Sequence, residues 1–180
     1  MHDVDQLHRA APDDAPTCSI FTASILLGRS ERTLQRWCEE GALRTVHRDP
    51  RKSQRQLIDL RQVLERFGLL PDAAFPELVV QADRGDADAQ TELALALLAT
   101  EHNAAAVTFL EAAARQGRPE AMHWLFLCHI QGRGVPLDED QAMAWLNKAA
   151  ANGHVIAREQ ARALRVAALR QMQRQADEPR

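Results

Sequence analysis

The feature that most constrains this fold is an internal repeat in the second half of the chain. Gly85, Gly117 and Gly153 each end a helical pattern, at spacings of 32 and 36 residues. Alanine recurs three residues before and four residues after each glycine, and leucine recurs seven residues before it. Small residues at fixed positions let paired helices approach closely, and the leucines fill the space between them. A period in this range predicts a short solenoid of helix pairs.

The clearest copy of the repeat ends at Gly153. It carries the pattern Gly-x-Pro-Glu-Ala-Met, then Gly132-x-Gly134-Val135-Pro136-x-Asp138, then Ala142-x-x-Trp145-Leu146-x-x-Ala149-Ala150-x-x-Gly153. This pattern is similar to the Sel-one-like repeat, a relative of the tetratricopeptide repeat, and the resemblance implies a protein-interaction scaffold. An earlier copy over residues 87–117 keeps the helical signatures but has Glu101-His102-Asn103 in place of the glycine loop.

The segment after the repeats, residues 154–176, is predicted to be a capping helix. One apolar stripe runs along it, made of Ile156, Ala157, Ala161, Leu164, Ala168, Leu169 and Met172. Arginines lie outside the stripe, at positions 158, 162, 165 and 170. A cap for the solenoid is the preferred interpretation, and the length of the segment leaves a homodimer open.

The first half of the chain contains a predicted helix-turn-helix over residues 21–37. Gly28 suits the positive φ of a tight turn, and Ser30 is a good N-cap for the second helix. Gly41 stands where a glycine ends that helix. Thr33, Leu34, Trp37 and Cys38 form the inward stripe.

The second helix leaves Arg32, Gln35, Arg36 and Glu39 facing outward. Arginine recognises guanine or phosphate, and glutamine recognises adenine. We therefore predict that this face binds duplex DNA, although an ordinary solvated face is the simpler alternative.

A basic hairpin is predicted after this helix. Residues 42–47 alternate apolar and polar side chains, residues 49–52 form a turn signal, and residues 55–58 return as a second strand. Asp59 then caps a helix with an apolar face. The predicted tip carries Arg48, Arg51, Lys52 and Arg55. These cations are expected to lie along DNA phosphates and to give salt-dependent affinity.

This part of the chain resembles the MerR-like and excisionase-like DNA-binding domains. The resemblance rests on Ala23-x-x-x-Leu27-Gly28-x-Ser30-x-Arg32-Thr33-Leu34-x-Arg36-Trp37, followed by Gly41-x-Leu43 and Leu57-Ile58-Asp59. These domains are small winged helix-turn-helix units. The resemblance implies that Ser30, Arg32, Gln35 and Arg36 face DNA and that Trp37 belongs to the core. One departure is Gly68-Leu69-Leu70-Pro71, which stops the long dimerising helix of MerR regulators. MerR-style dimerisation and promoter untwisting are therefore not expected.

The charge distribution separates the two halves. The whole chain has a formal net charge of −3. Residues 17–70 nevertheless hold ten cationic and six acidic side chains, whereas residues 71–153 hold five and twelve. A basic first half beside an acidic second half indicates two modules with different partners.

Other sequence features narrow the function. Three scattered cysteines without a CxxC pair predict neither disulfides nor a zinc site, and the seven histidines show no metal-ligand spacing. We see no phosphate-binding glycine loop and no nucleophile elbow, so we expect no enzyme, no cofactor and no metal. The N-terminus lacks the apolar run of a signal peptide, and no stretch is long enough to span a membrane. A cytoplasmic protein is expected.

Together these patterns predict a mainly α protein with four parts. An acidic disordered leader covers residues 1–16, a winged helix-turn-helix domain with a two-stranded hairpin covers 17–70, a linker covers 71–76, and the repeat domain with its capping helix covers 77–180. The predicted function is a bacterial-type DNA-binding regulator or DNA-anchored adaptor whose repeats bind a protein partner. The alternative is an interaction adaptor that uses both modules without DNA.

Overall fold

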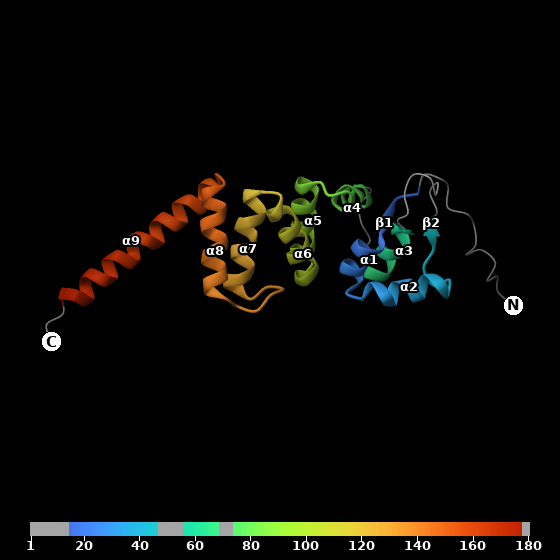
Figure 1. Ribbon diagram of the computed structural model, residues 1–180, viewed down its shortest axis with the longest axis horizontal. Helices are drawn as coiled ribbons and strands as arrows, with labels where there is room; N and C mark the ends of the chain where they lie inside the picture. Colours follow the sequence, from blue (N-terminus) through green and yellow to red (C-terminus); the bar gives the residue numbers. More distant parts are fainter. Residues whose placement is uncertain (1–14, 47–55, 69–73, 178–180) are drawn as a thin grey trace. The chain divides into compact units, whose positions relative to one another are not determined.

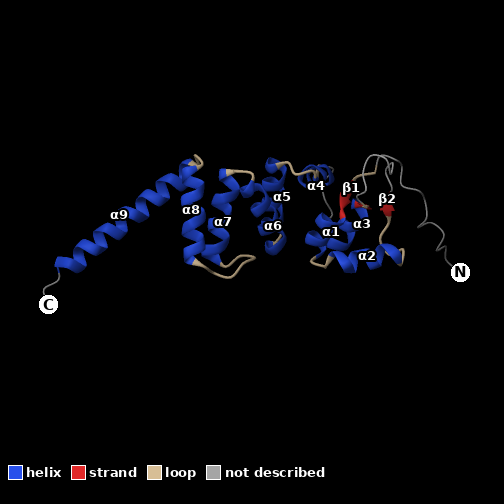
Figure 2. Cartoon of the chain, viewed as in Figure 1, coloured by secondary structure: helices blue, strands red, loops and turns tan. Residues whose placement is uncertain are grey.

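The structure is a computed structural model that describes residues 15–46, 56–68 and 74–177. Its contacts divide the chain into two compact units, Met1–Asp83 and Arg84–Arg180, each of which is described by itself. The described part is mainly helical with one small sheet (Figures 1 and 2).

The first unit contains an antiparallel sheet of three short strands. They are β1 (Thr17–Ser19), β2 (Thr45–Val46) and β3 (Leu57–Asp59), in the order β1-β3-β2. Ile58 at the centre pairs with Cys18 on one side and with Thr45 on the other. The sequence predicted only the two later strands. A three-residue strand such as β1 is too short to show alternation, and it becomes a strand only because β3 pairs with it.

The strand predicted over residues 42–47 is shorter than expected. The backbone N–H groups of Ala42 and Leu43 both donate to the carbonyl oxygen of Trp37, at 2.8 and 3.0 Å. These two residues therefore close the end of a helix, and only Thr45 and Val46 pair in the sheet. His47 lies outside the described residues.

The described residues of the first unit also form four helices: α1 (Ile20–Leu27), α2 (Glu31–Glu39), α3 (Leu60–Phe67) and α4 (Phe75–Asp83). Side-chain oxygens of Ser19, Ser30 and Asp59 cap the first three, so the two caps predicted at Ser30 and Asp59 are present. The core contains one fully buried set from several elements: Cys18, Ala23, Leu34, Leu43, Ile58, Leu60 and Val63.

The limits of this unit differ from those expected. The repeat pattern assigned residues from 77 onward to the second domain, whereas the contacts place α4 in the first unit. Asp83 at the end of α4 accepts hydrogen bonds from the Ser19 N–H, the Ser19 hydroxyl and the Thr22 hydroxyl. At the other limit, Ala15 is buried, and the Pro16 carbonyl accepts from the Leu60 N–H at 3.0 Å. The predicted leader therefore contributes its last two residues to the fold.

The second unit consists of helices that pack in sequence order. They are α5 (Ala87–Ala99), α6 (Asn103–Arg115), α7 (Pro119–Gln131), α8 (Glu139–Ala151) and α9 (Val155–Asp177). The pairs α5/α6 and α7/α8 pack most extensively, as expected for two helix-pair repeats (Figure 1). The repeated positions fill the core: Ala89, Leu93, Leu110, Ala114, Ala121, Leu125, Leu146 and Ala157 are all buried.

The capping helix is only partly a cap. Ala157 and Ala161 are buried, but Ile156, Leu164, Leu169 and Met172 are exposed. The apolar stripe is therefore buried only at Ala157 and Ala161, and its other members, which include Ile156 in the first turn, are exposed. Helix α9 has 23 residues and spans about 34 Å, whereas α8 has 13 residues and spans about 20 Å. The longer helix continues past its packing partner (Figure 1).

Candidate functional site

Helix α2 presents its polar side chains on a separate face from its core residues. Leu34 is fully buried, and Thr33, Trp37 and Cys38 are half-buried. Arg32, Gln35, Arg36 and Glu39 are exposed, as the helical spacing predicted. Because a single buried leucine and its half-buried neighbours fix the rotation of α2, the outward face is well defined.

A tight turn places α2 after α1. Gly28 has φ of 59°, and its N–H donates to the carbonyl of Ile25 at 3.3 Å. The Arg29 N–H donates to the Ser24 carbonyl at 3.1 Å, which completes the end of α1. The positive φ is unstrained for glycine, as expected from the sequence. Arg29, which sequence reasoning did not select, is exposed in this turn.

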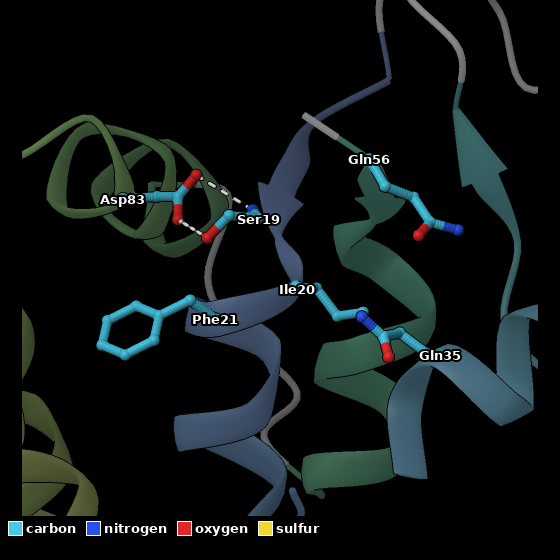
Figure 3. Close-up of a pocket in the computed structure, with 6 residues that line it drawn as sticks. All are labelled: Ser19, Ile20, Phe21, Gln35, Gln56 and Asp83. Atoms are coloured by element: carbon cyan, nitrogen blue, oxygen red, sulfur yellow. Dashed lines mark hydrogen bonds between the residues drawn. The ribbon is translucent and has the colours of Figure 1, made fainter. Parts of the chain in front are cut away.

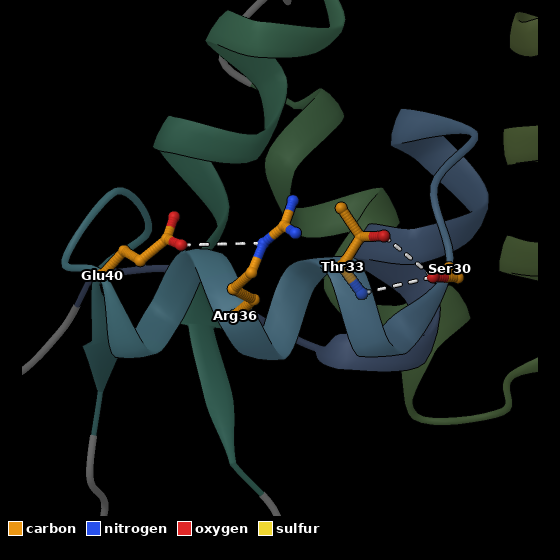
Figure 4. A network of polar contacts seen from close by, with 4 residues as sticks. All are labelled: Ser30, Thr33, Arg36 and Glu40. Carbon is orange, nitrogen blue, oxygen red and sulfur yellow. Dashed lines mark hydrogen bonds and ion pairs between the residues drawn. The ribbon is translucent and has the colours of Figure 1, made fainter.

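The Ser30 hydroxyl caps the N-terminus of α2. Its oxygen accepts from the Thr33 N–H at 3.2 Å and lies 2.9 Å from the Thr33 hydroxyl (Figure 4). These contacts start α2, so the contribution of Ser30 is to hold the helix in place. Its exposure leaves the side chain accessible beside the cap.

Arg36 forms the only ion pair on the described face of α2. Its Nε atom lies 3.7 Å from Oε1 of Glu40, one turn away (Figure 4). Both side chains are mostly exposed, at 65% and 59%. A long, exposed pair of this kind contributes little free energy, so an incoming phosphate can displace it and form shorter bonds with the guanidinium.

The charges in and beside α2 nearly balance. Three arginines at positions 29, 32 and 36 stand beside three glutamates at 31, 39 and 40. The cationic excess of this half of the chain comes from Arg48, Arg51, Lys52 and Arg55. These four predicted wing residues lie outside the described residues. The described strands on either side of them, β2 and β3, pair with each other, so the intervening residues connect two adjacent strands.

A cleft of about 430 Å³ adjoins α2 in the first unit. Its lining consists of Ser19, Ile20, Phe21, Gln35, Gln56 and Asp83 (Figure 3). The Asp83 carboxylate in this lining accepts hydrogen bonds from the hydroxyls of Ser19 and Thr22, and Phe21 is 54% exposed. No sequence signal indicated this cleft, because Asp83 is distant in sequence from the residues that it contacts.

The described thiols are poorly suited to nucleophilic chemistry. Burial raises the pKa of Cys18 far above its usual value, and nearby Asp83 and Asp59 raise it further. Burial likewise raises the pKa values of Cys38 and Cys128. Thiols held protonated are unreactive. Within the residues that the structure describes, no group of three or more His, Cys, Asp or Glu side chains could hold a metal ion.

In the second unit, the glycine loop between α7 and α8 packs against the preceding repeat. The Arg133 guanidinium donates to the Leu98 carbonyl at 3.0 Å and to the Asn103 side-chain oxygen at 3.3 Å. The neighbouring Gly134 approaches the Asn103 backbone so closely that a Cβ atom there would lie 2.4 Å from its carbonyl oxygen. This contact joins the two repeats at the loop as well as through the helices.

A pair of histidines joins α7 to the start of α9. The rings of His123 and His154 stack with centroids 4.4 Å apart, and His123 is 3.0 Å from the side-chain oxygen of Gln160. Nδ1 of His154 accepts from the Ala157 N–H at 3.1 Å. Burial and the charge of His123 lower the pKa of His154, with Glu120 opposing them. The geometry requires an unprotonated Nδ1, so His154 acts as a neutral cap for α9.

Comparison with known families identifies one part of the second unit. Residues 119–154 match the Sel1 repeat, which confirms the resemblance that the α7/α8 segment showed in its sequence. Repeats of this kind are typically non-catalytic modules for protein–protein interaction. No curated protein and no solved structure matched the chain. In the described parts of the chain, every helix is too short or too polar to cross a membrane.

Proposed function

We propose that this protein is a DNA-anchored adaptor. In this proposal the first unit binds duplex DNA, and the Sel1-containing unit binds a protein partner. The observation that carries the DNA-binding part is the outward face of α2, where Arg32, Gln35 and Arg36 are exposed beside a buried Leu34. A helix with arginine and glutamine on its free face has the donors and acceptors that the major groove recognises.

The order of elements supports the same proposal. Helix α1, the turn at Gly28, helix α2, the paired strands β2 and β3, and helix α3 follow one another as in winged helix-turn-helix domains. In such domains the second helix enters the groove and the hairpin lies along the backbone. Four cationic residues lie between β2 and β3 in the sequence, which suits a role in binding phosphates: Arg48, Arg51, Lys52 and Arg55.

The repeats supply the adaptor part of the proposal. The Sel1 match at residues 119–154 indicates a protein-interaction module, and residues 71–153 carry an excess of acidic side chains. An acidic module does not compete with the first unit for DNA, so the two units are suited to different ligands.

Fluorescence anisotropy with a labelled generic duplex tests the DNA-binding part. We expect wild-type binding to weaken steeply as salt increases from about 50 to 200 mM, because phosphate contacts release counterions. The variant Arg32→Ala/Arg36→Ala should bind at least about tenfold more weakly. The matched control Arg84→Ala/Arg115→Ala removes the same charge from exposed sites in the second unit and should bind like wild type.

The near-balance of charge in and beside α2 favours a second candidate, an adaptor that uses both units to bind protein. That function predicts no duplex binding even at low salt. Equal weakening by the Arg32/Arg36 variant and by the control would also count against groove recognition, since only net charge would then matter.

A further inference from the structure

Helix α9 has the sequence register of the first helix of a repeat. Ala157 stands four residues after Gly153, as Ala121 stands four after Gly117, and both alanines are fully buried. In the same register Ala161 corresponds to Leu125, and both are buried. The first two turns of α9 therefore pack on the preceding pair just as α7 does.

The next position in this register behaves differently. Leu164 of α9 corresponds to Cys128 of α7. Cys128 is 1% exposed in α7, a helix that packs against α8, whereas Leu164 is 45% exposed. Ala168 and Met172 continue the same face by helical spacing, and both are exposed. We call Leu164, Ala168 and Met172 the free stripe. It is a direct continuation of a face that the fold already uses for helix packing.

A row of arginines leads to the start of the free stripe. Arg158, Arg162 and Arg165 follow Ala157, Ala161 and Leu164 by one position each, so they form a row along one edge. In the part of α9 whose side chains are described, none of these arginines forms an ion pair, and Glu159 is the one acidic residue. The row therefore leaves uncompensated positive charge at the N-terminal end of the free stripe, beside Leu164.

We propose that the free stripe and its arginine row bind an acidic amphipathic helix of a partner protein, in the position that the second helix of a repeat takes on α7. This proposal rests on the adaptor role stated above and names the surface and the partner class. Ala168 in the free stripe allows a helix to approach closely, which favours a packed helix over a lipid surface. Pairing two copies of α9 would bring two arginine rows together, which disfavours a second copy.

The test uses the full chain and a designed probe. The probe is a fluorescein-labelled peptide of about 21 residues, or three heptads, with leucine and alanine on one face and glutamate at the flanking positions. A second peptide has lysine in place of every glutamate. The protein variants are Leu164→Gln and Arg162→Gln/Arg165→Gln, all at exposed positions. The matched control is Leu137→Gln, because Leu137 is an exposed leucine (63%) outside α9.

We expect the acidic peptide to bind wild type and the Leu137 control equally. Either α9 variant should weaken this binding by about tenfold or more, and the lysine peptide should bind at least about tenfold more weakly than the acidic one. Absence of binding, equal binding of both peptides, or binding that ignores the α9 substitutions would overturn the proposal.

Two further measurements identify other occupants. Self-association in analytical ultracentrifugation that Leu164→Gln abolishes would assign the stripe to a second copy. Sedimentation with vesicles of phosphatidylserine and phosphatidylcholine that depends on Leu164 would assign it to a membrane. Either result overturns the proposal.

Duplex binding measured on the same samples should be unchanged by the α9 variants. Failure of wild type to bind DNA would count against the DNA-anchoring role alone, and loss of duplex binding in the α9 variants would assign the arginine row to nucleic acid.

Discussion

Replacement of Gly134 by alanine should destabilise the second unit through both backbone strain and a steric clash, and comparison with Gly132→Ala should separate the two costs. Gly134 has φ of +75°, and a Cβ atom there would lie 2.4 Å from the Asn103 carbonyl oxygen, 2.5 Å from its carbonyl carbon and 2.9 Å from the Ala104 nitrogen. All three atoms belong to backbone at the start of α6, so no flexible side chain can move aside. The loop must therefore move away from the preceding repeat.

The expected destabilisation has two parts. A non-glycine residue in the left-handed region costs roughly 1–2 kcal/mol. Overpacking against a rigid neighbour typically costs about 1–3 kcal/mol more. The displaced loop also carries Arg133, whose bonds to Leu98 and Asn103 join the two repeats. We therefore expect Gly134→Ala to lower the free energy of unfolding by about 2–5 kcal/mol.

Gly132 in the same loop is the matched control. Its φ is +65°, and an added Cβ would meet only ordinary contacts, the nearest at 3.5 Å on Leu137. Gly132→Ala should therefore show the backbone cost of about 1–2 kcal/mol alone. Urea unfolding monitored by far-ultraviolet circular dichroism measures both variants. Equal losses for Gly132→Ala and Gly134→Ala would refute the reasoning, because the close approach would then carry no free energy.

Three other predictions follow from the hydrogen bonds of individual side chains. Asp83→Ala should destabilise the first unit by about 2 kcal/mol or more, because three hydrogen-bond donors lose their carboxylate acceptor. The control Glu77→Ala on the same helix should change the free energy of unfolding by less than about 0.5 kcal/mol, and urea unfolding compares the two variants. The lowered pKa of His154 means that the unfolded chain takes up its proton at higher pH than the folded chain. The stabilisation by His154 should therefore be complete above about pH 6.5 and lost as the pH falls below it, and His154→Asn should flatten this dependence in thermal unfolding at a series of pH values. Ser30→Ala should cost about 1 kcal/mol, and Ser30→Asp should restore it; a stability unchanged in the alanine variant would show that the cap contributes nothing.

The features that the sequence predicted correctly are mostly local. Ser30 and Asp59 cap helices because their side chains reach backbone N–H groups within three residues, and Gly28 ends α1 because its own φ is positive. The exposed face of α2 follows from helical spacing alone. The repeat was predictable for a related reason, since alanine and leucine recur at fixed distances from Gly85, Gly117 and Gly153.

The features that were missed depend on contacts between distant residues. Strand β1 exists because β3 pairs with it, and its three residues carry no pattern of their own. The assignment of α4 to the first unit depends on Asp83, which bonds to residues more than 60 positions earlier. Nothing in the sequence around Ser19 or Thr22 indicates that Asp83 will bond to them, and nothing around β1 indicates its pairing with β3.

The sequence by itself determined where several helices begin or end, which faces are apolar, and that the second half repeats. These properties depend on neighbouring residues and on the fixed period of a helix. Only the tertiary structure decided which apolar faces are covered. The face of α9 is continuous in the sequence, yet it is buried at Ala157 and Ala161 and exposed from Leu164 onward. An apolar pattern in the sequence indicates that a helix face favours burial. The face is buried only where another element lies within packing distance of it.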